Sequence, residues 1–339
     1  GPAPLAQVRT VAGEVGTCDF ADATGAAARF NVPSGIAVSR AGDLYVADFQ
    51  NFRVRRVTRA GAVTTLAGGA ATAGRLIDGR GAAAGFAYPS AIAIDDEDRL
   101  YVYDRCAVRA LTLAGEVTTL AGGAAADGTP LCGAVDDPAS ARARFDDGGS
   151  GGGIAVGPDR TVYVADFGNA AIRAIAPGGA VTTVAGGHGV GDRDGGATEA
   201  QLAGPSGVAV ADDGTLYVAD LANNRIRAVA PGGAVRTVAG SGADRSTDGV
   251  GRAAELSRPW AVAIARDGSL VVSENHGNLI RQIGADGTVT TLAGAGFAGG
   301  KDGPLRDATF YGPAQLAFGP GGELYVADQA GCTVRALTP

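Results

Sequence analysis

The chain has 339 residues, a formal net charge of −7 at neutral pH and a sequence pI near 4.9. An acidic domain is a poor match to nucleic-acid backbones, which require clustered positive charge, so nucleic acid is not an expected partner. No run of about 18 apolar residues is present, and the sequence therefore predicts no membrane-spanning helix.

The phrase LYVAD and its close variants occur six times along the chain, 54 to 62 residues apart. Self-similarity at such a period is the signature of a repeat architecture. Each occurrence ends in an acid, which we call the turn acid, and an arginine follows it five or seven residues later. The turn acids are Asp48, Asp104, Asp166, Asp220, Glu274 and Asp328, and the arginines are Arg55, Arg109, Arg173, Arg227, Arg281 and Arg335.

Two further runs accompany each LYVAD phrase, and both are short, β-branched and bounded by Gly, Pro and Asp, which is typical of strands. In chain order, a GIAV-like run occurs at 36–38, 92–94, 154–156, 208–210, 262–264 and 316–318. A VTTLAG-like run occurs at 63–68, 117–122, 181–186, 235–240 and 289–294, and its sixth occurrence lies at the N-terminus, at 8–13.

Four strands per unit and six units predict an all-β fold, a six-bladed β-propeller of four-stranded antiparallel blades. Residues 8–13 are expected to add the outermost strand to the last blade and so to remove the exposed edge where the ring closes. The propeller is expected to be a single domain over residues 8–339. Residues 1–7 are expected to be a linker, because Gly1-Pro2 resembles the scar that a tag-removing protease leaves.

The order PSGVAV, LYVAD, NNRIR and VRTVAG over residues 205–240 resembles the NHL-repeat family. The spacer DGGATEAQL at 194–202 is similar to that of bacterial and extracellular members. The resemblance extends over residues 8–338 and implies the propeller fold. It implies little about activity, because NHL propellers include sensors, adhesion modules, RNA-binding domains and a few lyases.

The turn acids are interpreted as structural residues. Catalysis needs one asymmetric site, whereas these acids recur in every unit, where their carboxylates can accept hydrogen bonds from the following turn and pair with the arginine. A second set of acids lies eight residues before a Phe or Leu and is predicted to cap short helical turns. This set is Asp22, Asp78, Asp137, Asp194, Asp248 and Asp302.

The four cysteines predict two disulfides, Cys18–Cys332 and Cys106–Cys132. Cys106 and Cys332 occupy the same turn in blades two and six, and each partner lies in the loop that follows the outer strand of the same blade. This is the one pairing of the three possible that keeps each bond within a blade. Free buried thiols are the alternative. Disulfides would place the domain outside a reducing cytosol, in an extracytoplasmic location.

Candidate ligand-binding residues lie where one unit departs from the others. Blade five carries Trp260, the one Trp of the chain, at a position where three other blades have Ser, together with Arg258, Asn275 and His276. These side chains could bind a ligand at the rim of the central channel by stacking and hydrogen bonding. Alternatively, Trp260 fills space between blades.

Two other departures are noted. The residue after the turn acid is Phe49, Phe167 or Leu221 in three blades, which is either an apolar patch for a partner or packing over a neighbouring loop. The glycine-rich stretch 146–156 adds three residues to blade three. It either approaches a ligand closely or is a flexible insert.

A non-catalytic recognition, sensor or adhesion domain is the favoured function, with a protein, peptide or glycan bound on the loop face by a monomer. No catalytic residue, metal site or cofactor is predicted, because two histidines cannot form a three-His zinc site and no nucleophile elbow occurs. The alternatives are a metal-dependent lyase or hydrolase of the propeller type and, with less support, an RNA-binding NHL module.

Overall fold

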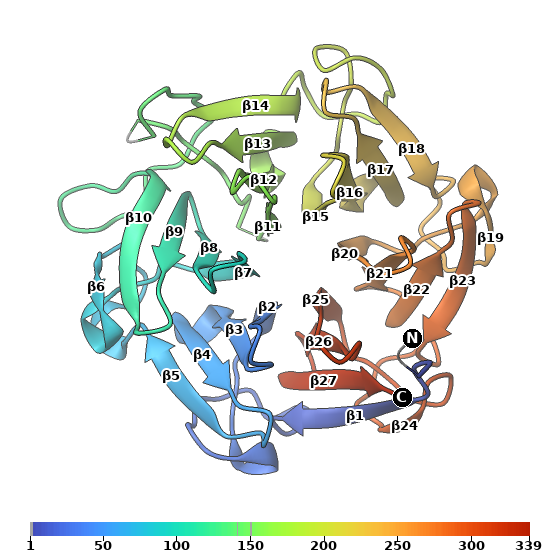
Figure 1. The fold of residues 1–339 in the computed structure, drawn as a ribbon, viewed down its shortest axis with the longest axis horizontal. Helices are drawn as coiled ribbons and strands as arrows, with labels where there is room; N and C mark the ends of the chain where they lie inside the picture. The colour runs from blue at the N-terminus through green and yellow to red at the C-terminus, as the bar shows by residue number, and fades with distance from the viewer. Residues whose placement is uncertain (1–2, 141, 150) are drawn as a thin grey trace.

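A computed structural model describes residues 3–140, 142–149 and 151–339. Six antiparallel sheets surround a central axis, and each sheet is one blade (Figure 1). The first three blades follow one another in the chain. Blade one consists of β2 (Pro33–Val38), β3 (Leu44–Asp48), β4 (Arg53–Val57) and β5 (Val63–Ala67); blade two of β7 (Pro89–Ile94), β8 (Leu100–Asp104), β9 (Ala107–Leu111) and β10 (Glu116–Gly122); and blade three of β11 (Ile154–Val156), β12 (Val162–Asp166), β13 (Ala171–Ile175) and β14 (Val181–Gly186).

The remaining blades complete the predicted count of six. Blade four consists of β15 (Pro205–Val210), β16 (Leu216–Asp220), β17 (Arg225–Val229) and β18 (Val235–Ala239); blade five of β20 (Pro259–Ile264), β21 (Leu270–Glu274), β22 (Leu279–Ile283) and β23 (Thr288–Ala293); and blade six of β25 (Pro313–Phe318), β26 (Leu324–Asp328), β27 (Thr333–Thr338) and β1 (Gln7–Ala12). Two-residue strands β6 (Gly79–Arg80), β19 (Gly249–Val250) and β24 (Gly303–Pro304) lie outside blades two, five and six.

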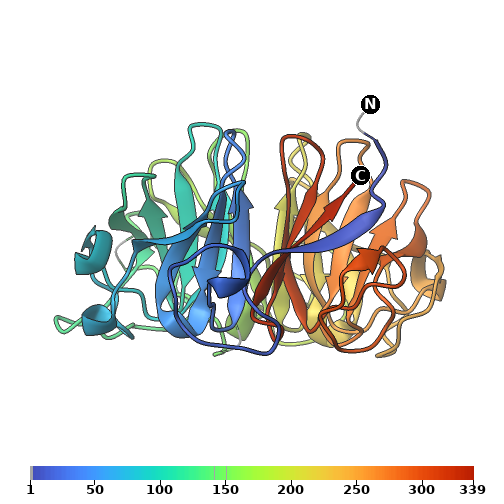
Figure 2. The same cartoon turned by 90° about the horizontal axis from the view of Figure 1, so that it is seen from below.

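Ring closure follows the prediction. Strand β1 pairs antiparallel with β27, with Val8 opposite Leu337 and Thr10 opposite Arg335. The main-chain N–H of Ala6 also donates to the carbonyl of Thr338, at 2.8 Å. The first and last strands are therefore neighbours in one sheet, and the two ends of the chain lie on the same side of the disc (Figure 2).

The helices of the described residues are single 3-10 turns, and none is long and apolar enough to cross a bilayer. Three of them, η2 (Phe49–Asn51), η5 (Phe167–Asn169) and η6 (Leu221–Asn223), directly follow a turn acid. The others lie in the loops between blades and are η1 (Gly25–Ala27), η3 (Ala70–Thr72), η4 (Gly81–Ala83) and η7 (Gly251–Ala253).

The core lies between blades. One cluster joins Phe30, Ile36 and Val46 of blade one to Val334 of blade six, and equivalent clusters fill the other seams. A fully buried apolar residue from each interblade loop anchors these clusters. These residues are Phe30, Phe86, Phe145, Leu202, Leu256 and Phe310. Burial of a side chain of this size stabilises the fold by about 1.5–3 kcal/mol.

Both predicted disulfides are confirmed. Cys106 is bonded to Cys132 within blade two, and Cys18 to Cys332 within blade six. The two bonds together use every cysteine among the described residues. The second bond links residues 314 positions apart and fastens the N-terminal loop to the last turn of the ring.

Candidate functional site

The six repeated arginines each bind two carboxylates in the interior of a blade. In blade one, Nη1 of Arg55 donates to Asp48 at 2.7 Å, and Nη2 donates to Asp22 at 2.6 Å. The other five blades repeat this arrangement, and each arginine is at most 2% exposed. Residues that look chemical in the sequence are thus part of the scaffold of each blade.

In five of the six blades the second set of acids does not cap a helical turn, and there the prediction was wrong. Asp137 of blade three is the exception, because it accepts N–H groups at the start of a turn. The residue before η1 is Thr24, and no side chain caps that turn. Asp22 instead accepts hydrogen bonds from Arg55 and from the main-chain N–H of Thr65 on the outer strand. The guanidinium of the buried arginine and the N–H of the outer strand both donate to this carboxylate. The acid therefore ties the loop to the blade and is not available to cap a helical turn.

Blade three needs a further correction, because Asp136 and not Asp137 fills this position. Asp136 accepts from Arg173 at 2.6 Å and from the N–H of Thr183 at 2.9 Å. Asp137 bonds locally to the N–H groups of Ala139 and Arg142.

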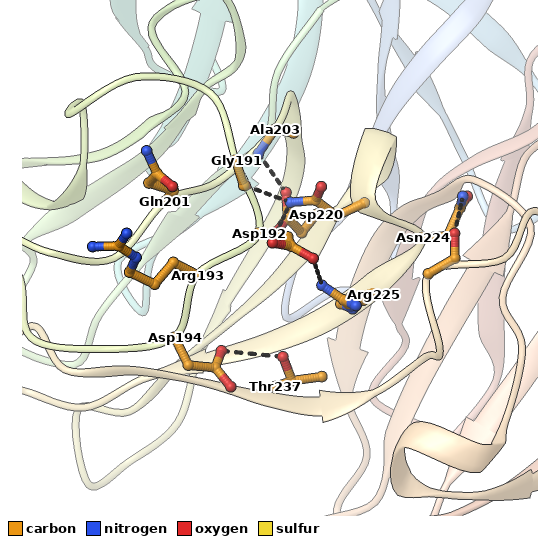
Figure 3. Close-up of polar contacts among 12 residues, drawn as sticks. Gly191, Asp192, Arg193, Asp194, Gln201, Ala203, Asp220, Asn224, Arg225 and Thr237 are labelled. Carbon is orange, nitrogen blue, oxygen red and sulfur yellow. Dashed lines mark hydrogen bonds and ion pairs between the residues drawn. The ribbon is translucent and has the colours of Figure 1, made fainter.

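Figure 3 shows the surroundings of the two acids of blade four, Asp220 and Asp194. Asp220 accepts the N–H of Ala203 at 2.7 Å, and Asp194 accepts the hydroxyl of Thr237 at 3.1 Å. On the surface beside them, Arg225 donates to Asp192 at 2.6 Å.

Burial raises the pKa of every turn acid, but the extent differs between blades. The pKa of Asp104 and of Asp328 rises to about 6, and that of Glu274 to about 7. These three blades lack the Asn that donates to the turn acid in blades one, three and four, as Asn223 does to Asp220 at 2.8 Å. Because a donor stabilises the charged form, the additional amide opposes the effect of burial.

Blade five brings Arg258 and His276 together around Asp244, a residue that the sequence analysis missed. Asp244 Oδ2 lies 3.4 Å from His276 Nδ1 and 3.7 Å from Arg258 Nε, and Asp244 Oδ1 accepts the hydroxyl of Ser257 at 2.6 Å. The Ser257 hydroxyl, followed by His276, holds the pKa of Asp244 below its usual value. More than half of the Arg258 and His276 side chains is exposed, so their donors face solvent on the loop face.

Asn275 lies at the edge of this cluster. Its N–H donates to the carbonyl of Arg258 at 3.2 Å, and its amide contacts Gln329 of blade six at 3.5 Å.

Trp260 is the second residue of β20, the innermost strand of blade five, and it lines the axis and not the polar cluster. Its half-buried side chain packs against the core cluster between blades five and six and lines a small cavity on the axis. Its carbonyl accepts the hydroxyl of Ser206 from blade four at 2.8 Å. The structure thus shows the packing between blades that was one of the two alternatives. Ligand binding by Trp260 stays a prediction.

Two of the three apolar residues that follow turn acids lie against neighbouring loops, and the third is buried. Phe49 contacts Tyr88, with ring centroids 5.1 Å apart. The ring of Phe167 is covered on two sides, since an added Cβ at Gly148 or Gly204 would lie within 2.9 Å of it. Leu221 is 9% exposed.

The glycine-rich stretch of blade three packs against Tyr103, which replaces the Ala found at this strand position in four other blades. The Tyr103 hydroxyl reaches Asp166 at 3.3 Å. An added Cβ at Gly152 would lie 2.7 Å from the Tyr103 ring. The inner strand β11 is shortened by this detour, and Ser150 within the stretch lies outside the described residues.

The central channel is divided by Gln315, the third residue of β25. The equivalent residues of the other five inner strands are Gly35, Ala91, Gly153, Gly207 and Ala261, and we call these six positions the axial column. On one side of Gln315 lies the small cavity beside Trp260, of about 20 Å³. On the other side lies a wider hollow of about 290 Å³, lined mainly by branched apolar residues and by one alanine from the inner strand of each blade.

Potential metal ligands do not gather at the channel. Among the described residues, one group of three ligand side chains lies close enough for an ion, and two of its members are the disulfide-bonded Cys106 and Cys132, with Asp146.

Comparison with known families supports the repeat assignment. The NHL repeat model matches residues 30–57, and the teneurin NHL domain model matches residues 189–230. The matched segments lie in blades one and four of a six-bladed ring whose remaining blades repeat the same phrases. This chain is an NHL-repeat β-propeller.

Relatives of this NHL propeller are much longer proteins. The protein SUPPRESSOR OF QUENCHING 1, chloroplastic, of Arabidopsis thaliana is 36% identical to this chain over 155 residues. The alignment covers 41% of this chain and 15% of the relative. The aligned part is therefore a small fraction of that protein.

Solved structures share the fold at low sequence identity. An auxiliary nutrient binding protein of Bacteroides thetaiotaomicron superposes with a TM-score of 0.70 at 15% identity, over 98% of this NHL propeller and 76% of that chain. A streptogramin B lyase superposes with a TM-score of 0.58 at 14% identity, over 97% of both chains.

Proposed function

We propose that this NHL propeller is a non-catalytic recognition domain that binds a protein, peptide or glycan ligand on its loop face. The loop face is the side that carries the turns after the turn acids and the loops between blades. The supporting observation is the exposed cluster of Arg258, His276 and Asp244, which has no counterpart in the repeated scaffold. The domain acts as a monomer.

The chemistry of this cluster suits binding through hydrogen bonds. A guanidinium and an imidazole flank one carboxylate, so the surface offers donors and an acceptor within a few ångströms, which is the pattern that orients a polar ligand. Asn275 extends the donor surface towards blade six. Phe49 and Tyr88, on the opposite half of the ring, supply an aromatic surface that could hold an apolar part of a large ligand.

An extracytoplasmic location is part of the proposal. It is supported by the two disulfides, which persist in oxidising compartments. The similarity in fold to a nutrient binding protein is consistent with this location.

A metal-dependent lyase or hydrolase is the alternative function, and it is less well supported. The similarity to a streptogramin B lyase is one of fold. The described residues nearest the axis are Gly, Ala, Ser, Gln, Trp260, Phe318 and branched apolar residues, which supply no carboxylate or imidazole. An RNA-binding role is opposed by the net charge of −7.

Peptide display and a glycan array with the immobilised propeller would test the proposal. We expect a ligand whose binding weakens by about tenfold or more in Arg258→Ala and His276→Ala, since hydrogen bonds to charged groups contribute about 1.5–3 kcal/mol. Arg266→Ala is the matched control, because Arg266 is an exposed arginine of the same blade in the turn at the opposite face. Equal binding by all three variants, or conversion of the ligand to a product, would contradict the proposal.

A further inference from the structure

Gln315 binds the main chain of two other blades across the axis. Its Oε1 accepts the N–H groups of Ile36 at 3.2 Å and Ile92 at 3.1 Å, and its Nε2 donates to the carbonyl of Ile92 at 2.8 Å. One carboxamide therefore satisfies two donors and one acceptor of the inner strands of blades one and two.

The same main-chain groups are present in blades three to five. Ile92 directs both its N–H and its C=O to the axis, and in a strand the two groups of one residue point to the same side. The inner strands pair with their neighbours in the same register, Ile92 opposite Val102. The equivalent residues are Ile154, Val208 and Val262, which lie opposite Val164, Val218 and Val272.

No glutamine serves these three blades. Their residues in the axial column are Gly153, Gly207 and Ala261, whose side chains are too short to reach across the channel. The donors and acceptors that Gln315 satisfies in blades one and two thus have no equivalent side-chain partner in blades three to five.

A cavity lies at this position. It has a volume of about 20 Å³ and is lined by Ile154, Val208, Val262, Trp260 and Gln315, among others. One water needs about 10–15 Å³, so the space holds one to two water-sized groups, such as the NH₂ and the oxygen of one carboxamide. No ionisable side chain lines it, and the nearby hydroxyl of Ser206 already donates to the carbonyl of Trp260.

We infer that this cavity is a receptor for a primary carboxamide, the group of an Asn or Gln side chain on a ligand bound to the loop face. The inference rests on the proposed function and names the chemistry of one contact of that ligand. Gln315 provides the internal example of how a carboxamide is held by the axial main chain. Trp260 lies beside the cavity and would contact the ligand atoms next to the carboxamide.

A carboxylate of the same shape is excluded by the same groups. Each axial residue presents a C=O beside its N–H, so one oxygen of a carboxylate would face a carbonyl, and the charge would lie in a site with no cation to pair it. A carboxamide places its NH₂ there instead. An alcohol or a single water satisfies fewer of these groups.

Fluorescence of Trp260 gives a direct measurement, because this is the one Trp of the chain. The probes are propionamide and propionate, which differ in charge and in the NH₂ group. We expect a saturable change in emission with propionamide, with a Kd in the millimolar range for so small a molecule. Propionate should bind at least about tenfold more weakly. Equal responses to the two probes, or a linear response to both, would mean that the cavity holds water only and would overturn the inference.

Two variants test the geometry with the unfolding temperature as a second measurement beside the fluorescence of Trp260. Ala91→Gln places a carboxamide from blade two over blades three and four, as Gln315 reaches blades one and two from blade six. It should abolish the propionamide response and unfold at a higher temperature than Ala91→Leu, which fills the same space without an amide. An equal or lower unfolding temperature than that of Ala91→Leu would count against the inference.

Gln315→Ala removes the resident carboxamide and should lower the unfolding temperature. Propionamide should raise the unfolding temperature of this variant by more than it raises that of the wild type, and propionate should not. The absence of this rescue would contradict the role assigned to the axial main chain.

Failure of this inference is distinguishable from failure of the proposed function. If a loop-face ligand depends on Arg258 and His276 but binds Ala91→Gln normally, the inference alone is wrong. If Arg258→Ala and His276→Ala leave ligand binding unchanged, the proposed site is wrong whatever the result with propionamide.

Discussion

Blades four and five are neighbours with the same four strands and the same buried arginine, yet blade five differs at several other positions that carry a polar role. Blade four has Asp220 as its turn acid, held by the amide of Asn223. In blade five, the turn acid is Glu274, the position of the Asn is taken by Gly277, and the hydroxyl of Ser246 donates to the carboxylate. A side chain at Gly277 has no room, because an added Cβ would lie 2.5 Å from Ser246 Oγ. The longer acid, the glycine and the serine hydroxyl thus compensate one another, because Ser246 replaces the donor that is lost with the Asn and Gly277 leaves room for Glu274.

A second compensation accompanies Trp260. In blade four, the hydroxyl of Ser206 ties the inner strand to the carbonyl of Trp260 in the next blade. Trp260 has no hydroxyl for the corresponding bond to blade six, but Ser273 replaces an Ala and donates to the carbonyl of Ala314 at 2.7 Å. The comparison therefore separates two kinds of difference in blade five. The changes at the turn acid and at Trp260 are compensated by other residues, so the blade keeps its hydrogen bonds. The side chains of Arg258, His276 and Asp244 replace no hydrogen bond of the repeated blade, and they carry the proposed function.

The largest expected effect comes from removing the buried arginine of each blade. Arg227→Ala leaves Asp220 buried without its cation and should lower the free energy of unfolding by about 3–5 kcal/mol. Arg281→Ala should cost less at pH 7, because Glu274, whose pKa is about 7, takes up a proton more readily. Urea denaturation measures both.

Arg225→Ala is the control for this pair of variants, because its partner Asp192 is largely exposed and the loss should stay below about 1 kcal/mol. Equal losses for Arg227→Ala and Arg281→Ala would show that the two turn acids do not differ as proposed.

The second effect is the pH dependence that Glu274 of blade five contributes to stability. Burial raises the pKa of Glu274 from 4.5 to about 7 in the folded state. Between these values the folded protein binds more protons than the unfolded chain, so the free energy of unfolding falls as pH rises from about 5 to about 7.5, by on the order of 2–3 kcal/mol. Stability from this group is full at low pH and lost above pH 7.

Glu274→Gln should remove this part of the slope, and urea denaturation at pH 5 and pH 8 compares it with the wild type. Asp220→Asn in blade four should remove a smaller part, because Asn223 already stabilises the charged form there. A slope unchanged in Glu274→Gln would refute the assignment.

A third, intermediate effect tests the compensation at the turn. Gly277→Asn alone should destabilise the protein by about 1–3 kcal/mol through overpacking against Glu274 and Ser246. Glu274→Asp combined with Gly277→Asn recreates the pair found in blade four and should recover at least half of that loss. A double-mutant cycle from thermal unfolding gives the coupling, and additive losses would mean that the two residues are independent.

The smallest effect is expected at the links between blades. Ser273→Ala removes the hydrogen bond to Ala314 and should cost about 1 kcal/mol, and Ser206→Ala should cost a similar amount in blade four. Differential scanning calorimetry resolves the shift in unfolding temperature. A cost confined to one of the two variants would mean that Ser273 does not replace the function of the missing serine.

The fold and both disulfides could be predicted because they depend on periodicity and strand direction, which the sequence states six times over. Residue roles within a loop could not. The choice between Asp136 and Asp137 depends on which carboxylate reaches Arg173, and an adjacent pair of acids carries no signal for that in the sequence. The glycine-rich stretch is explained by Tyr103, which lies about 50 residues away in another blade.

Part of the candidate site had a sequence signal that was overlooked. Gln315 is the one long residue in a column of Gly and Ala, and comparison of the third residue of each inner strand would have identified it. Asp244 also had a signal, because the loops before blades four, five and six have the same length and carry Val190, Asp244 and Ala298 at this position. Its role shows only in the structure, where it lies between Arg258 and His276.

The bond between Cys18 and Cys332 makes the chain between these residues a closed covalent loop. A protease that hydrolyses one peptide bond anywhere in that loop would therefore release no separate fragment. The nicked molecule would gain the mass of one water and stay a single covalent species until a reductant opened the disulfide. All six blades have their inner strands within this loop.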